Sequence, residues 1–430
     1  MSIGRRTRSA AGLSLIEIMI ALAISSVLVL GLVEVFAASR TAYQLSTGLA
    51  RVQENGRFAL DFLQRDVRMA GHLGCVNDQA RFLPENVTPS RPALASTFLN
   101  DVDQLAANYA AAPEALRFDI GMQGYDAKID GAGAATGSGS TIALTTAPTA
   151  ATAGSAWQPA LSVALFDDIN GPAGSAGKPA QNSDILVLRY FTPTGAQMTK
   201  FTPGDPATIE FDPAQEARLT EGVTSPGLFG VTDCINAAVF EATTFDTVNH
   251  AVTVKIDGAA NKSGLLGNQS FVQGQAIVYR AESVVYYVGI NASGNPSLYR
   301  LRYTMAPGAA APTPVREELV EGIESLQLQY GQDSHTAANE RPTGNIGSSV
   351  IANAVQPAAD PATAWRRVGL VQVGLVARSP EPAAAAQRDT SNGEVAPLSA
   401  LGVVVTPPND QRYRTVYEDS IALRNRLFGN

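Results

Sequence analysis

The chain has 430 residues, of which 45% are hydrophobic and 16% charged, a balance that fits a folded protein of one large or two ordinary domains. Its formal net charge of −8 argues against a body that binds nucleic acid through a basic surface. The sequence has three histidines and two cysteines, and it contains no HExxH, P-loop, strand-linked GxGxxG or metal-spaced Cys/His pattern. We therefore predict no catalytic residues, no metal site and no cofactor.

The N-terminal region has two parts. Residues 1–12 form a leader with three arginines and no acid, whereas residues 13–36 are apolar and carry no charge between Ile18 and Val33. The uncharged run would make a helix about 24 Å long, near the thickness of a bilayer. We therefore expect residues 13–36 to insert in a membrane, with the leader on the cytoplasmic side.

One acid, Glu17, interrupts the apolar run, and a carboxylate in lipid is unfavourable unless it is neutral or paired. An ordinary secretory signal has a small-residue cleavage site after its apolar part, but no convincing site follows Phe36. If the chain is cut after Gly12 instead, the new amine at Leu13 lies about one helical turn from Glu17. The two groups can then pair, either within one chain or between chains.

The segment Gly12–Ile18 resembles the prepilin processing motif of type IV pilins and type II secretion pseudopilins. In those proteins a dedicated prepilin peptidase cuts after the glycine, and the new N-terminus is methylated. The resemblance implies cleavage between Gly12 and Leu13, methylation of Leu13, where these families usually have Phe, and a role for Glu17 in assembly and register. The alternative is a signal anchor in which Gly12 and Glu17 occur by chance.

The helical pattern continues through an amphipathic half, residues 37–74. Its apolar face recurs at steps of three and four residues with one longer gap: Leu45, Leu49, Val52, Ala59, Leu63 and Val67. The opposite face alternates in charge: Glu54, Arg57, Asp61 and Arg65. One helix from Leu13 to Ala70 would be roughly 85 Å long, and Gly71 and Gly74 signal its end.

Three glycines lie inside this predicted helix, Gly31, Gly48 and Gly56, and each costs about 1 kcal/mol relative to Ala. Two interpretations are open. The glycines are small residues at packing contacts, or they are weak points that let the helix bend or melt when it packs in a filament.

Both cysteines, Cys75 and Cys234, should lie across the membrane from the leader, in an oxidising compartment. We therefore predict a disulfide between them. It would close a loop of about 160 residues and stabilise the fold by up to about 5 kcal/mol by chain entropy. Two free buried thiols are the alternative.

Past Cys75 the sequence changes to short β-like runs, which predict an antiparallel β-rich body over residues 75–430. The predicted strands are Leu116–Ile120, Thr141–Thr145, Ile185–Phe191, Val252–Ile256, Ala276–Tyr279, Ser283–Ile290, Leu298–Tyr303, Leu326–Tyr330, Val368–Ala377 and Arg414–Tyr417. Low-complexity segments predict surface loops at residues 130–157, 170–181, 305–314 and 379–397. A boundary between two β subdomains is predicted near residues 264–274. The fold class is therefore α+β, a long N-terminal helix packed on a large β-rich body.

Several segments are similar to the PilW family of minor type IV pilins: Asp66–Cys75, Val231–Cys234, Glu318–Gly331, Trp365–Ser379 and Arg412–Arg426. These segments span the helix exit, the second cysteine and the C-terminal third. Residues 80–225 match no motif that we can name, and their role is left open.

The candidate chemical residues outside the N-terminal region have ordinary structural interpretations. Asp333, Ser334 and His335 are contiguous and cannot point at one another as a catalytic triad must, so they predict a turn. His72 is expected to cap the helix end, and His250 to lie on the surface. Glycines 131, 133, 137 and 139 fit a linker better than a phosphate-binding loop.

Four tyrosines in predicted strands could form an aromatic binding face, but cross-strand packing is the usual role of such residues. They are Tyr286, Tyr287, Tyr299 and Tyr303.

The PilW resemblance implies a non-enzymatic minor pilin that assembles with other minor pilins to prime and tip the type IV pilus. It implies other minor pilins, the major pilin and a large PilY-type tip adhesin as partners, and prepilin peptidase for processing. The body would be periplasmic, held by one inner-membrane helix, and then extracellular at the pilus tip. The alternatives are a minor pseudopilin of type II secretion and a pilin-anchored adhesin or receptor.

Overall fold

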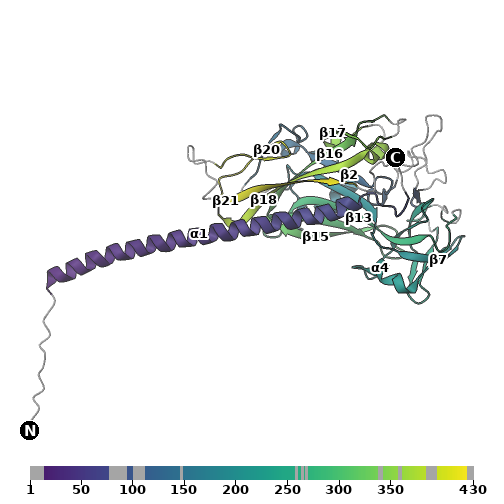
Figure 1. Cartoon of the computed structure of the whole chain (residues 1–430), viewed down its shortest axis with the longest axis horizontal. Coiled ribbons are helices and arrows are strands. Elements are labelled where there is room, and N and C mark those ends of the chain that lie inside the picture. The colour runs from purple at the N-terminus through teal and green to yellow at the C-terminus, as the bar shows by residue number, and fades with distance from the viewer. Residues whose placement is uncertain are drawn as a thin grey trace, which may run out of the picture.

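The structure is a computed structural model in which a long helix is joined to a β-rich body (Figure 1). It describes residues 14–76, 94–99, 112–145, 149–256, 260–262, 266, 270–337, 342–356, 361–383 and 395–423. The first half of the helix projects away from the body, and the second half lies along it (Figure 1). The α+β class predicted from the sequence is confirmed.

The long helix α1 runs over Leu15–Met69, within two residues of its predicted bounds. It starts at Ser14 as N-cap, and Gly71 and Gly74 follow its end with φ of +68° and +72°. A residue with a Cβ adopts such φ values only with strain, so these glycines let the chain leave the helix and turn into the body.

The largest sheet is built around β13, Ile277–Ile290, which pairs with β14 on one side and β6 on the other. Alternate β13 side chains enter two different cores, because Val284 and Tyr286 face α1 whereas Val285 and Tyr287 face away. The other strands of this sheet are β1 (Leu94–Ser96), β2 (Met122–Ala127), β4 (Trp157–Gln158), β5 (Lys178–Pro179), β6 (Ile185–Phe191), β7 (Ala196–Thr202), β8 (Ala207–Phe211), β9 (Leu228–Thr232), β10 (Ala237–Glu241), β11 (Thr244–Asp246), β12 (Ala251–Val254), β14 (Pro296–Thr304) and β15 (Thr313–Glu321).

A second sheet has the antiparallel order β17–β16–β18–β21, and a small third sheet has the order β19–β20–β3. Their strands are β16 (Ile323–Asp333), β17 (Ile346–Val350), β18 (Val368–Pro382), β21 (Arg412–Ala422), β3 (Thr141–Ala143), β19 (Leu398–Ala400) and β20 (Val403–Thr406). The body is antiparallel as predicted, except that β1 pairs with β10 and β3 with β20 in parallel. Short helices connect the strands: α3 (Val163–Asn170), α4 (Glu216–Thr220), α5 (Pro361–Arg366), η2 (Glu114–Leu116), η3 (Ile129–Gly131), η4 (Gly154–Ala156), η5 (Pro213–Gln215) and η7 (Ala352–Ala354).

The main core joins α1 to both large sheets. Val52, Ala59, Leu63 and Val67 of the predicted apolar face are fully buried in it, against apolar residues of β6, β13, β16 and β18. A separate core fills the lobe formed by β7 to β12, at the end of the body far from the N-terminus (Figure 1). The amphipathic half of α1 is therefore a structural part of the body.

Nine of the ten predicted strands fall on observed strands. The two runs Ala276–Tyr279 and Ser283–Ile290 belong to the single strand β13. The strand predicted at Leu116–Ile120 is wrong, because Glu114–Leu116 form a 3-10 helix and turns follow it. Leu116 and Ile120 are nevertheless buried. The apolar pattern therefore indicated that these residues are buried, but it did not indicate a strand.

All four predicted loop regions overlap regular structure: β5 lies in the region at residues 170–181, and β15 begins inside the region at residues 305–314. The segment at residues 130–157 includes β3 and the buried Trp157, whose indole N–H donates to the carbonyl of Ser183 at 2.9 Å. β18 extends to Pro382, into the loop predicted at residues 379–397. The predicted boundary at residues 264–274 includes positions outside the described residues. The strands β9 and β13 on either side of it pair with one another.

Candidate assembly surface

The first turn of α1 places Glu17 against the backbone at the start of the helix. The amide of Ser14 donates to Glu17 Oε2 at 2.9 Å, and the amide of Glu17 donates to Ser14 Oγ at 3.2 Å. This is a capping box, in which two side chains satisfy amides that the helix leaves unpaired. The residues of the predicted cleavage site, Gly12 and Leu13, lie outside the described residues.

The capping box bears on the predicted partner of Glu17. The sequence predicts that its carboxylate pairs with the amine of Leu13, whereas the described residues show it bound to Ser14. A serine three residues before a glutamate, ahead of an apolar run, is the sequence signature of this cap. Ser14 and Glu17 have this spacing, so the cap could have been predicted from the sequence. One carboxylate can accept several hydrogen bonds, so the cap leaves Glu17 able to accept from a further donor.

The first half of α1 has no contact with the body. From Leu15 to Phe36 its large apolar side chains are exposed. Within the part of the chain that the structure describes, α1 is the helix long and apolar enough to cross a membrane by length and composition. Exposed apolar surface of this extent normally marks a membrane or protein interface.

The three helix glycines have different surroundings. A Cβ on Gly56 would lie 2.2 Å from the ring of Tyr417, and one on Gly48 would lie 2.8 Å from Ala383 Cβ. Nothing lies within 4 Å of the same position on Gly31. The packing interpretation therefore holds for Gly48 and Gly56, since only glycine lets β21 and the end of β18 approach the helix so closely.

Asp66 fixes the last turns of α1 to the large sheet. Its carboxylate, 2% exposed, accepts from Tyr286 Oη at 2.6 Å and lies 3.4 Å from Arg300 Nη1. Burial, and then the negative charge of Asp66, raise the pKa of Tyr286 well above its usual value, so the phenol stays protonated and donates. This contact is not predictable from the sequence, because nothing in the helical pattern distinguishes a buried acid from an exposed one.

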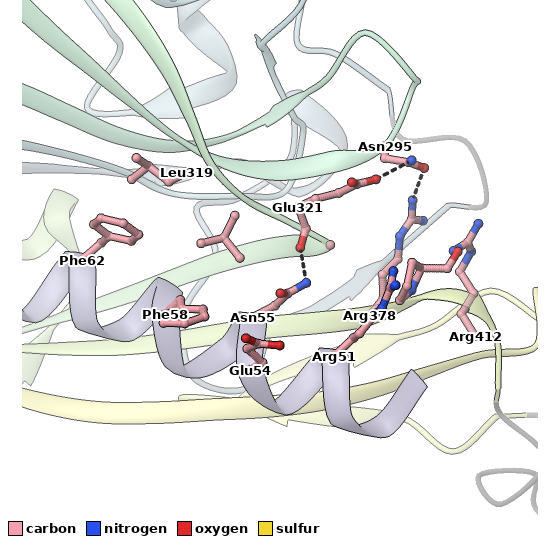
Figure 2. Close-up of a pocket in the computed structure, with 13 residues that line it drawn as sticks. Arg51, Glu54, Asn55, Phe58, Phe62, Asn295, Leu319, Glu321, Arg378 and Arg412 are labelled. Atoms are coloured by element: carbon pink, nitrogen blue, oxygen red, sulfur yellow. Dashed lines mark hydrogen bonds between the residues drawn. The ribbon is translucent and has the colours of Figure 1, made fainter. Parts of the chain in front are cut away.

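A groove of about 690 Å³ lies between the amphipathic half of α1 and the β14–β15 hairpin (Figure 2). Asn55 donates from its side chain to the carbonyl of Glu321 at 2.9 Å and so bridges the groove. Phe58 is 53% exposed beside it, and Leu319 lies on the opposite side (Figure 2). Because β15 pairs with β14 alone, its outer edge lies open next to this helix face.

The predicted disulfide is present. Cys75 and Cys234 are bonded with Cα atoms 4.7 Å apart, joining the chain just after α1 to the turn between β9 and β10. The alternative of two free thiols is therefore wrong. The bridge holds the exit of α1 against the large sheet.

The remaining candidates have structural surroundings. His72 does not cap α1 as predicted: its Nδ1 lies 2.9 Å from the carbonyl of Phe191, and its ring packs edge-on against Tyr279. His250 is half-buried and lies 2.6 Å from Glu216 Oε2. Asp333 ends β16 and Ser334 is a bend, so the turn predicted for these residues begins only after Asp333, whose carboxylate accepts from the amides of His335 and Gly344.

The tyrosines considered as a binding face are buried: Tyr286, Tyr287, Tyr299 and Tyr303. Tyr287 stacks on Tyr299 at 5.7 Å between ring centroids. The packing interpretation is the correct one. Among the described residues, no group of His, Cys, Asp and Glu has the arrangement of a metal site.

These features define a class before any comparison. An apolar helix that leaves its first half free and packs its second half on a disulfide-closed β-rich body, with Glu17 near its start, is the architecture of a prepilin-like protein. Such a helix suggests anchoring in the inner membrane before assembly.

Comparison with known families agrees with this class. Residues 285–425 match the family described as Type IV Pilus-assembly protein W, PilW, and residues 7–33 match the Prokaryotic N-terminal methylation motif. The C-terminal third of the chain is therefore similar to the PilW family of type IV pilus assembly proteins, and its N-terminus carries the prepilin-type methylation motif. Comparison with curated proteins gave no match, and neither did comparison with solved structures.

Proposed function

We propose that the chain is a minor pilin, a non-enzymatic subunit that assembles with other minor pilins to prime the type IV pilus and occupies its tip. The observation that carries this proposal is the division of α1. Its first half, Leu15 to Phe36, exposes apolar side chains along its length, and its second half is built into the body. A subunit of this kind can wait in the bilayer and then exchange lipid for the apolar helices of its neighbours.

Processing would precede assembly in this proposal. Prepilin peptidase cuts between Gly12 and Leu13, and Leu13 is then methylated. The new N-terminus lies one residue before the cap formed by Ser14 and Glu17. Cleavage therefore leaves the cap intact and places the new amine beside a carboxylate.

Glu17 would set the register of the subunit among its neighbours. In a bundle of apolar helices, a carboxylate that meets the N-terminal amine of an adjacent subunit is paired. A subunit displaced along the bundle would bury that charge without a partner, which is strongly unfavourable. The cap on Ser14 pre-orients the carboxylate, so that less side-chain freedom is lost when the neighbour arrives.

The partners in this proposal are other minor pilins, the major pilin and a large PilY-type adhesin at the tip. The body would face the periplasm, held by one inner-membrane helix, and reach the cell exterior with the fibre. The groove beside Phe58 is lined by apolar and charged side chains of α1 and the body, and in this proposal it is a surface where the helix of an adjacent pilin packs.

The priming role is tested by removing the gene and restoring it. A strain without it should hold major pilin in the inner membrane and display few surface fibres, and the wild-type gene should restore them. Immunogold labelling of an epitope-tagged chain should mark fibre ends. Normal piliation without the gene contradicts priming, and even labelling along the shaft contradicts a tip position.

A further inference from the structure

A second cavity, unrelated to the free half of α1, lies where that helix ends on the body. It has a volume of about 750 Å³ and is enclosed by the last turns of α1, the connection from β6 to β7, the end of α4, and the strands β13 and β14. We call it the arginine cleft. Its volume is in the range of small-molecule sites.

The arginine cleft is more positive than the chain around it. Six arginines and four acidic residues line it, whereas the whole chain has a formal net charge of −8. Its floor is a sheet face on which Arg280 and Glu282 of β13 point the same way and Arg302 lies on the neighbouring strand β14. A concave surface with this local excess concentrates anions.

Two arginines of the cleft are held by other residues. Arg280 donates from Nε to Glu282 at 2.7 Å and from Nη1 to the carbonyl of Glu221 at 2.6 Å. Arg300 donates from Nε and Nη2 to Glu317 at 2.9 and 2.7 Å. These contacts hold both guanidinium groups in place, each beside a carboxylate that offsets part of its charge.

Arg302 differs from both. Its side chain is only 21% exposed, and its Nε is buried with no hydrogen-bond partner among the described residues. The nearest carboxylate oxygen, on Glu282, lies 3.9 Å from that nitrogen, too far for a hydrogen bond. A buried donor without a partner is unfavourable, and a bound ion or water molecule is one of the explanations for such a group.

We propose that the arginine cleft binds a small molecule carrying an oxyanion, a carboxylate or a phosphate, which Arg302 holds. A guanidinium presents parallel N–H donors whose spacing matches the two oxygens of such a group. Arg280 lends charge beside it, and the rest of the cleft has room for a body of sugar size. This site is independent of pilus assembly and would exist in the unassembled subunit.

The test uses the full chain in uncharged detergent micelles, with calorimetric titration and thermal unfolding in three probes: inorganic phosphate, glucuronate and glucose. Phosphate, glucuronate or both should bind and raise the unfolding temperature, and glucose should do neither. The preferred anion identifies the group that the cleft accepts. Absence of binding by both anions overturns the proposal.

Arg302→Gln should weaken binding of the preferred anion at least tenfold, and Arg302→Lys should weaken it less, because Lys keeps the charge but not the paired donors. Arg57→Gln, an exposed arginine of α1 outside the cleft, is the matched control and should bind as the wild type does. Unliganded unfolding temperatures show whether each variant is folded. The proposal is overturned if Arg302→Gln binds the anion as tightly as the wild type does. It is also overturned if Arg57→Gln loses as much affinity as Arg302→Gln, because the binding would then depend on general surface charge.

Discussion

The two halves of α1 are one continuous helix with opposite surroundings. Between Leu15 and Phe36 the large apolar side chains are exposed, whereas Val52, Ala59 and Leu63 are completely buried against the sheets. Helical geometry is the same in both halves, so geometry does not explain the difference. The difference shows that the apolar side chains of the free half need lipid or another protein to cover them. Those of the packed half are already covered by the body.

The largest expected effect comes from the acid of the free half. Glu17→Ala should leave membrane insertion intact and abolish incorporation into fibres, because the carboxylate that sets the register is lost. Fractionation and immunoblotting of sheared fibres measure both. Glu34→Ala, which removes the other acid of the apolar region, should assemble normally.

Glu17→Gln separates charge from capping. The Gln side chain can still accept from the Ser14 amide but has no charge to pair with a neighbour's amine. Our proposal predicts that this variant fails to assemble, as Glu17→Ala does. Normal amounts of Glu17→Gln in sheared fibres would show that the cap alone matters.

The next effect concerns the attachment of the packed half. Replacing Cys75 and Cys234 by Ser should lower the free energy of unfolding by up to about 5 kcal/mol, because the open chain gains the entropy of a loop of about 160 residues. Denaturant unfolding of the full chain in micelles, followed by tryptophan fluorescence, measures it. The wild type under reducing conditions should approach the double variant, and equal stability of all three samples would contradict a stabilising bridge.

The glycines offer a direct comparison of the halves. Gly56→Ala should destabilise the body by roughly 1–3 kcal/mol, because the new methyl group overlaps the ring of Tyr417. Gly31→Ala meets no atom and should leave the stability of the body within about 0.5 kcal/mol of the wild type. The same unfolding experiment measures both variants. An equal loss of stability in the two would contradict the claim that only the second half of α1 packs on the body.

The last prediction concerns a single hydroxyl, and its expected effect is similar in size to that of Gly56→Ala. Tyr286→Phe removes the donor to the buried carboxylate of Asp66 and should cost about 1.5–3 kcal/mol, as expected for a hydrogen bond to a charged group. Tyr43→Phe changes a side chain that is 73% exposed and should have no measurable effect. A loss below 0.5 kcal/mol for Tyr286→Phe, on the order of a surface change, would contradict the role given to Asp66.

The pattern of apolar residues predicted the helix well, because each half of the helix has its own recognisable pattern. An unbroken apolar run predicts lipid or helix contact, and steps of three and four residues predict one buried face. The predicted end at Ala70 and the observed end at Met69 agree within a residue. The disulfide could be predicted because the compartment follows from the leader.

One of the strands that were missed, β15, lacks such a signal. β15 contains Pro314, Arg316 and three glutamates, and it is a strand because β14 provides its partner. β13 seemed to be two strands because Arg280 and Glu282 interrupt its apolar run, yet these residues lie in the arginine cleft. Contacts between distant segments, such as Asp66 with Tyr286, depend on tertiary packing and have no local pattern.

The central claim is that the chain is a prepilin, which is cut after Gly12 before its apolar helix packs against those of other subunits. Intact-mass spectrometry of the protein purified from cells with active prepilin peptidase tests it most directly. Our account predicts a chain that begins at Leu13 and carries a methyl group on its amine. A chain that retains residues 1–12 in those cells would contradict it.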